Sequence, residues 1–358
     1  MKEAVVFVPG FYAKCQNYYL DTFLTPGLLA QLEDIDITLD PEEAKIPGQT
    51  GRRFHWLLED KERIMDIYEV YWDDLVDRLS AKENIPKFWQ GLSMIFYWFG
   101  RCWKLMRLSN VLLWQTSFIL AMVLTWYFGV VVLVLSTIAV NVPPISQIAD
   151  LENQLSPIIR WASDGKGWLI WSALSFGLTS LPLSIDLVID FTHFFTNYLR
   201  SESVKGKPPV RALVRNRVKQ AVDNVTREGS YQRFTVLAHS MGGLIATDFL
   251  ADYQGRQFRY ITWGSMLESS SKATEWINSE IKKCLDNPHV ERWDDFYSNQ
   301  DWFCSNVPVP GDYPQPKLIS KKVSFKVSFF KQFSGESHME YFFDPKVLRH
   351  LIMGYSGS

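Results

Sequence analysis

The sequence has little cysteine and almost no net charge, and each shortage excludes a class of protein. Its 358 residues carry 37 Lys and Arg against 39 Asp and Glu, a formal net charge of −2. No basic run with interleaved aromatic residues occurs, so charge gives no basis for binding nucleic acid. Cys15, Cys102, Cys284 and Cys304 show neither C-x-x-C spacing nor a histidine cluster. The spacing therefore predicts neither a zinc site nor a disulfide framework.

The beginning of the sequence lacks the long apolar segment of a secretory signal peptide. Residues 4–8 are instead a short β-branched apolar run, which is typical of a buried strand, and the turn residues Pro9 and Gly10 end it. We therefore expect the chain to enter a core strand at once, without a signal peptide.

Residues 234–250, FTVLAHSMGGLIATDFL, combine a strand-like run with a helix-like run, and Ser240 separates them. A serine hydroxyl is a weak nucleophile at neutral pH, so a hydrolase must hold it beside a base and close to backbone N–H donors. A sharp strand-turn-helix does this where small residues flank the serine, and here they are Ala238 and Gly242. The segment therefore predicts Ser240 as a nucleophile.

Residues 238–242, AHSMG, resemble the G-x-S-x-G nucleophile elbow of the α/β-hydrolases, with alanine in place of the first glycine. The turn PGFY after residues 4–8 resembles the oxyanion loop of lipases. The resemblance implies that the backbone N–H groups of Phe11 and Met241 point at the developing oxyanion. Either motif alone also fits an ordinary turn, and it is their occurrence together that favours a hydrolase.

From residue 88 the composition changes to a dense mixture of apolar and aromatic residues. An uncharged stretch has its apolar part at residues 111–140, and residues 167–185 form a second, weaker apolar segment. Because about 20 helical residues cross a bilayer, we expect both to span it. Residues 88–106 mix aromatics with cations, which is typical of an interfacial segment. A hydrophobic cap domain of a soluble lipase is the alternative.

Two membrane crossings return the chain to the side from which it left, as a hydrolase requires when its two halves share one sheet. Basic residues lie outside the hairpin on both sides: Arg101, Lys104 and Arg107 before it, and Arg200, Lys205 and Lys207 after it. The positive-inside rule therefore predicts a multi-pass membrane protein whose catalytic domain faces the cytoplasm, with the lipid bilayer as a partner.

The predicted fold is α/β: an α/β-hydrolase-like, mostly parallel sheet flanked by helices and interrupted by an α-helical hydrophobic insertion, expected as a transmembrane hairpin. Residues 1–84 form the first part of the hydrolase domain, 85–200 the insertion, and 201–358 the second part with the elbow. Further expected helices are 18–32, 209–228, 273–285 and 345–353, and further strands are 64–72, 258–263, 290–297 and 322–330.

Several acidic residues compete for the role of the catalytic acid. In the resembling family the acid follows a late strand and precedes V-P, which selects Asp301. Asp294 and Asp295 lie within the presumed strand 290–297, whereas a catalytic acid must reach over the edge of the sheet. Asp73 and Asp74 follow an earlier strand, and we expect them to cap the next helix.

His338 follows the last predicted strand and precedes the closing helix. The order Ser240, Asp301, His338 is the order of this family's triad. His350 lies within the last helix and His239 beside the nucleophile, and for both we expect a structural role.

Together these features predict a membrane-anchored serine esterase or lipase that cleaves carboxylic esters, with lipid acyl esters as substrates, through an acyl-enzyme on Ser240. Such a reaction needs no metal or organic cofactor. Two alternatives stay open: an acyltransferase of the same fold, and a catalytically inactive membrane-bound scaffold or binding protein.

Overall fold

The computed structural model describes most of both predicted hydrolase parts and a small share of the insertion. The described residues are 1–32, 35–40, 42–79, 89–93, 117, 120–121, 123–129, 185–201, 208–228, 230–301, 303–309, 317–328, 331–332 and 335–353. Most of the apolar segment 111–140, nearly all of 167–185 and most of 88–106 lie outside them. Within the described part of the chain, no helix is both long enough and apolar enough to cross a membrane.

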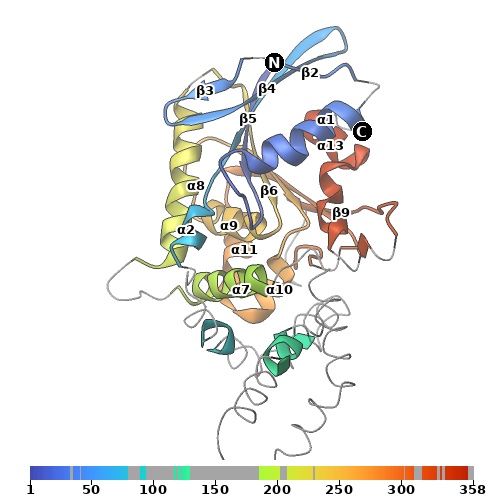
Figure 1. Cartoon of the computed structure of the whole chain (residues 1–358). Coiled ribbons are helices and arrows are strands. Elements are labelled where there is room, and N and C mark those ends of the chain that lie inside the picture. Colours follow the sequence, from blue (N-terminus) through green and yellow to red (C-terminus); the bar gives the residue numbers. More distant parts are fainter. Residues whose placement is uncertain are drawn as a thin grey trace, which may run out of the picture.

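One largely parallel sheet organises the described residues, as Figure 1 shows. Its strand order is β2-β4-β5-β1-β6-β7-β8-β9, with β3 paired to β4. All strands from β5 to β9 in this order run parallel, so their carboxyl ends share one edge. The strands are β1 Lys2–Val8, β2 Thr38–Leu39, β3 Ala44–Ile46, β4 Gln49–Leu58, β5 Lys61–Glu69, β6 Arg233–His239, β7 Phe258–Trp263, β8 Val290–Tyr297 and β9 Leu318–Lys322.

Helices cover both faces of this sheet (Figure 1). Strand β1 explains why: its side chains alternate between the faces, so Val6 joins the core beneath α8, α9 and α11 while Phe7 joins the core beneath α1 and α13. The helices are η1 Leu20–Leu24, α1 Thr25–Gln31, α2 Asp74–Asp77, α7 Ile185–Arg200, α8 Val210–Arg227, α9 Met241–Leu250, α10 Leu267–Ala273, α11 Trp276–Asp286, η2 Glu336–Phe342 and α13 Pro345–Met353.

The predicted strands 258–263 and 290–297 and the predicted helix 345–353 are confirmed as β7, β8 and α13. The predicted helix 273–285 was wrong at its start, because Thr274 adopts an extended backbone that ends α10 before α11 begins. The predicted strand 322–330 was also wrong, since β9 ends at Lys322. The apolar alternation beyond it reflects packing of Val323 and Phe325 in the core, not strand pairing.

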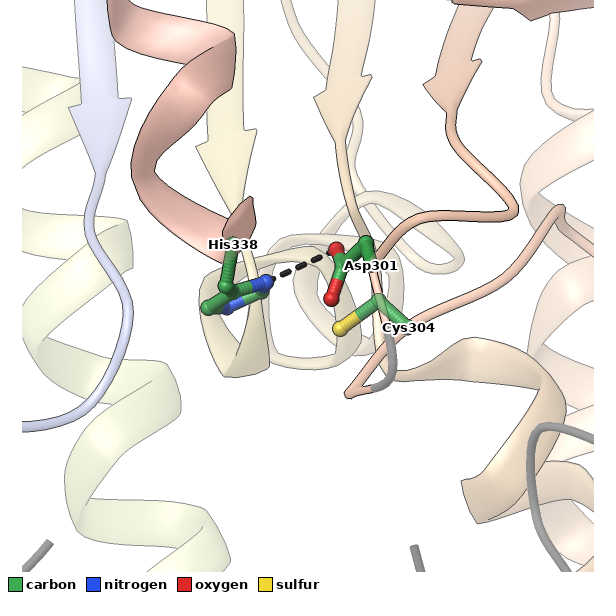
Figure 2. Close-up of side chains that lie close together, drawn as sticks. All are labelled: Asp301, Cys304 and His338. Carbon is green, nitrogen blue, oxygen red and sulfur yellow. Dashed lines mark hydrogen bonds and ion pairs between the residues drawn. The ribbon is translucent and has the colours of Figure 1, made fainter. Parts of the chain in front are cut away.

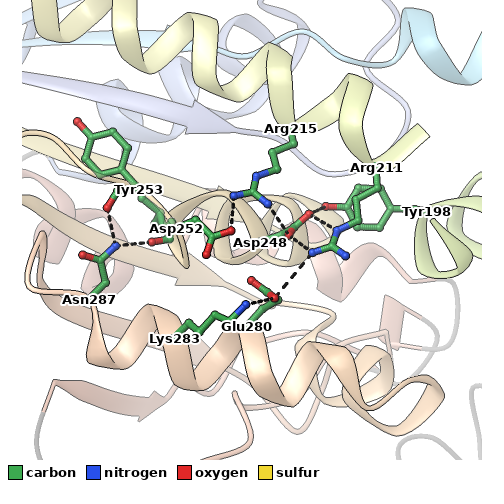
Figure 3. A network of polar contacts seen from close by, with 10 residues as sticks. Tyr198, Arg211, Arg215, Asp248, Asp252, Tyr253, Glu280, Lys283 and Asn287 are labelled. Carbon is green, nitrogen blue, oxygen red and sulfur yellow. Dashed lines mark hydrogen bonds and ion pairs between the residues drawn. The ribbon is translucent and has the colours of Figure 1, made fainter. Parts of the chain in front are cut away.

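Helix α7, which leads out of the insertion, is fixed to the body by the buried network in Figure 3. Asp248 of α9 is fully buried; it accepts hydrogen bonds from the Tyr198 hydroxyl at 2.8 Å and from Arg211 at 2.9 and 2.5 Å. The Arg211 guanidinium also stacks 3.7 Å from the ring centroid of Trp276. Helix α7, at the end of the predicted insertion, therefore packs against α9, the helix that follows the candidate nucleophile.

Candidate active site

Ser240 lies between β6 and α9 with φ 57° and ψ −126°, a left-handed backbone that non-glycine residues seldom adopt. Position 242 requires glycine, because a Cβ there would lie 2.1 Å from the carbonyl oxygen of Val8. The alanine that replaces the first glycine of the motif is accommodated, with Ala238 fully buried in the core. This strained turn presents Ser240 at the carboxyl edge of the sheet.

Asp301 and His338 meet at the same edge, as Figure 2 shows. The Nδ1 of His338 lies 2.8 Å from the Oδ2 of Asp301, with the carboxylate fully buried and the imidazole 13% exposed. The Tyr341 hydroxyl donates to the same oxygen at 3.2 Å, and the Phe303 N–H donates to Oδ1 at 2.9 Å. These donors fix the carboxylate so that it can orient the imidazole.

The neighbouring Asp294 serves a different purpose. It is paired with Arg292 at 2.9 Å, with His350 at 3.1 Å and with Lys321 at 3.4 Å. Burial raises the pKa of this carboxyl, but the hydrogen bond from His350 and the charges of Lys321 and Arg292 outweigh burial and lower the pKa to about 2. His350 thus ties α13 to β8, which agrees with the structural role expected for it.

Asp295 also points away from the imidazole, into the core beside β7 and β9. It accepts hydrogen bonds from the Thr262 hydroxyl at 2.7 Å and from the Val307 N–H at 3.0 Å. Burial raises its pKa to about 6. Because Val307 lies in the loop that carries Asp301, Asp295 anchors this loop, and no described residue links it to His338.

The hydroxyl of Ser240 and the free nitrogen of His338 are not hydrogen bonded to each other in this structure. The hydroxyl lies close to the thiol of Cys304, and the buried Nε2 of His338 has no partner among the described residues. Burial, followed by the charge of Asp301, raises the pKa of Cys304 well above its ordinary value. Catalytic hydrogen bonds are often absent or long without substrate, so this arrangement is compatible with a resting triad.

Side chains from neighbouring segments fix the turn that follows β1. The indole nitrogen of Trp72 donates to the Pro9 carbonyl at 3.3 Å, and the Tyr19 hydroxyl donates to the Phe11 carbonyl at 2.7 Å. A Cβ at Gly10 would lie 2.9 Å from the Cβ of Ser240, so the turn passes directly beside the serine. No described residue accepts a hydrogen bond from the Phe11 N–H, which leaves this donor for a ligand.

The prediction that Asp73 caps the next helix was wrong. Helix α2 does begin at Asp74, but Asp73 makes no side-chain capping bond. Its buried carboxylate instead lies beside the backbone N–H groups of Ala13 and of Tyr12, whose φ of 78° is left-handed. Burial raises the pKa of Asp73 to about 8. Sequence reasoning missed this contact, although parallel pairing of β1 and β5 brings the two strand ends together.

His239 supports the imidazole of the candidate triad from behind. It is fully buried, its Nε2 lies 3.0 Å from the His338 carbonyl oxygen, and the two ring centroids are 4.5 Å apart. Burial lowers the pKa of His239 well below 6.5, so the ring is neutral and its Nε2–H donates to that carbonyl. These contacts agree with the structural role expected for His239, because they hold the backbone of His338 in place.

Aromatic side chains of α7 pack against the turn beside Ser240. The Phe11 ring lies 5.0 Å from Phe191 and 6.3 Å from Phe194, measured between centroids. Phe194 stacks in turn on Trp72 at 5.2 Å. Helix α7, at the end of the predicted insertion, therefore forms an apolar wall next to the candidate oxyanion donor.

A family model described as serine aminopeptidase, S33, matches residues 200–333, which include Ser240 and Asp301. No curated protein and no solved structure matches the chain. The match agrees with the parallel sheet and with the strained serine turn between strand and helix. The fold of the described residues is α/β-hydrolase-like, and the family match over residues 200–333 supports this resemblance.

Proposed function

We propose that this chain is a membrane-anchored serine hydrolase that cleaves carboxylic esters of lipid acyl chains. The observation that carries the proposal is the pair of Asp301 and His338, 2.8 Å apart at the strand edge where the left-handed Ser240 lies. An acid that orients an imidazole beside a serine held in this turn is the constellation for nucleophilic acyl transfer.

In the proposed reaction the Ser240 hydroxyl turns to the Nε2 of His338 and attacks the ester carbonyl carbon. His338 takes the hydroxyl proton, and Asp301 stabilises the imidazolium through Nδ1–H. The N–H groups of Phe11 and Met241 bind the oxyanion. His338 then protonates the departing alcohol, and water repeats the sequence to release the fatty acid and restore the serine.

Two features support a lipid substrate. The uncharged segments 111–140 and 167–185 fit a hairpin that keeps the hydrolase on the cytoplasmic face. The rings of Phe191 and Phe11 provide apolar surface beside the candidate nucleophile. An acyl chain that packs there gains up to about 0.8 kcal/mol for each methylene removed from water, and less when it comes from a bilayer.

A second candidate reaction comes from the matched family model, whose description names an aminopeptidase. Peptide cleavage would use the same serine, histidine and acid, because amide and ester hydrolysis share the acyl-enzyme. Substrate preference therefore has to be measured directly, with both substrate classes in the same assay.

A labelling and substrate experiment tests these alternatives. Purified full-length protein in lipid should react with a fluorophosphonate probe and should hydrolyse long-chain esters faster than acetyl esters and aminoacyl anilides. Preference for anilides would select the aminopeptidase, and preference for acetyl esters regardless of bilayer would refute the lipid substrate. Transfer of the acyl group to an added alcohol in preference to water would identify an acyltransferase, and absence of labelling would favour the inactive scaffold.

A further inference from the structure

Cys304 brings a thiol into the candidate active site, where the proposed hydrolysis has no use for it (Figure 2). One ligand atom each from Asp301, Cys304 and His338 lie within 4.8 Å of one another. Asp301 and Cys304 come from the loop after β8, whereas His338 comes from η2, so only the fold assembles the group. Carboxylate, thiolate and imidazole together are a ligand set that zinc prefers.

The three ligand atoms lie slightly farther apart than they would around a bound metal ion. Zinc bonds to nitrogen, oxygen and sulfur place tetrahedral ligand atoms about 3.3–3.6 Å apart. The three ligand atoms here lie within 4.8 Å of one another, so they need to approach by no more than about 1.2–1.5 Å. The buried Nε2 of His338 has no described partner, and the Ser240 hydroxyl lies close to the Cys304 thiol. The serine oxygen is therefore a candidate for the fourth ligand.

We propose that Asp301, Cys304 and His338 form an inhibitory binding site for a thiophilic divalent cation such as Zn²⁺. On binding, the Cys304 thiol loses its proton to solvent and the sulfur and one imidazole nitrogen coordinate the metal. A coordinated imidazole no longer serves as a base for Ser240. These three side chains should bind hard cations such as Mg²⁺ poorly, because such cations prefer oxygen ligands and octahedral geometry.

Inhibition rests on the hydrolase activity proposed above, whereas metal binding itself does not. The two are therefore measured separately. Cys284 provides a matched control, because it is also a free and fully buried cysteine but lies in α11, outside this group.

The binding experiment uses the metal-free full-length chain and its Cys304→Ala and Cys284→Ala variants, titrated with Zn²⁺ and with Cd²⁺. We expect one Zn²⁺ per chain in the wild type and in Cys284→Ala, and binding at least about tenfold weaker in Cys304→Ala. The ultraviolet charge-transfer absorption of Cd²⁺-thiolate should appear in the first two proteins and be lost in Cys304→Ala. If Cys304→Ala does not fold, Cys304→Ser retains the volume while removing the sulfur.

The inhibition experiment measures ester hydrolysis against Zn²⁺ concentration, with each variant normalised to its own metal-free rate. The inhibition constant should rise at least about tenfold in Cys304→Ala and stay unchanged in Cys284→Ala. Equal Zn²⁺ affinity in wild type and Cys304→Ala, or no Zn²⁺ binding to the wild type, would overturn the site. If the wild type shows Cd²⁺-thiolate absorption but no fluorophosphonate labels it, the metal site stands and the proposed hydrolase activity is rejected.

Discussion

Ser240 occupies a backbone conformation that strains any side chain, and this strain is the main residue-scale sign of chemistry in the molecule. Its replacement by alanine should leave the fold intact, because only one hydroxyl is removed from a buried position. We predict that Ser240→Ala abolishes fluorophosphonate labelling and ester hydrolysis. Gel-based labelling and thermal unfolding measure both effects, and Ser265→Ala, at a nearby buried serine, is the control that should still be labelled.

Asp301 and Asp294 are both buried carboxylates, but only Asp301 contacts the imidazole of His338. Asp301→Asn should therefore lower kcat by roughly 10⁴, the effect of losing the acid from an acting triad. Asp294→Asn should retain turnover and instead lose about 3 kcal/mol of stability, because it leaves buried cations without their partner. Steady-state kinetics and denaturant unfolding separate the two effects. Loss of turnover in Asp294→Asn but not in Asp301→Asn would identify Asp294 as the catalytic acid instead.

The pKa of Asp294 also predicts how stability depends on pH. Its pKa of about 2 in the folded protein is below the ordinary value near 3.9, so the folded state favours the charged carboxylate. The stabilisation is therefore complete above about pH 4 and is lost as the pH falls towards 2. We expect the stability of Asp294→Asn to fall less steeply than that of the wild type across this window, as measured by unfolding at each pH.

At the scale of elements, the end of β5 holds the turn that follows β1. Trp72 donates a hydrogen bond to this turn, and the buried Asp73 carboxylate lies beside it. In the proposed mechanism the N–H of Phe11, which no described residue accepts, binds the oxyanion. Asp73→Ala should therefore lower kcat by at least about tenfold with little change in KM, up to the 10²–10³ that loss of an oxyanion donor costs. Asp74→Ala is the matched control, since its carboxylate pairs with Arg78 and Arg217 instead. A kcat that falls equally in both variants would contradict this assignment.

Helix α7, at the end of the predicted insertion, contacts the turn after β1 through a second set of side chains. Its Phe191 packs on Phe11, and its Tyr198 is fixed by the buried Asp248 of α9. The candidate oxyanion turn is therefore held between β5 on one side and the end of the insertion on the other. Local pattern predicted none of these contacts, because each joins segments more than 45 residues apart.

At the scale of the whole molecule, the proposed membrane hairpin makes a topological prediction. A cysteine introduced at residue 154, between the two apolar segments, should react with an impermeant thiol reagent only from the side opposite the hydrolase. The exposed native Cys15 is the internal control for the hydrolase side. Labelling of both positions from the same side of sealed vesicles would rule the hairpin out.

Sequence pattern located most elements because their signals are local. Strand β7 is rich in aromatic and β-branched residues, β8 begins and ends in apolar or aromatic residues, and α13 has a clear apolar face. Strand β4, with the sequence QTGRRFHWLL, was not predicted because its polar residues hide the alternation. Its pairing with β5, a contact that depends on the fold, makes it a strand.

By itself the sequence determined the nucleophile candidate and the order of Ser240, Asp301 and His338, because the elbow is a local motif and the order follows the chain. Tertiary structure alone decided which side chains surround them. Cys304 meets His338, and Asp73 meets the turn after Phe11, only because the ends of parallel strands share one edge of the sheet. Such contacts leave no periodicity in the chain, since they depend on the packing of distant segments.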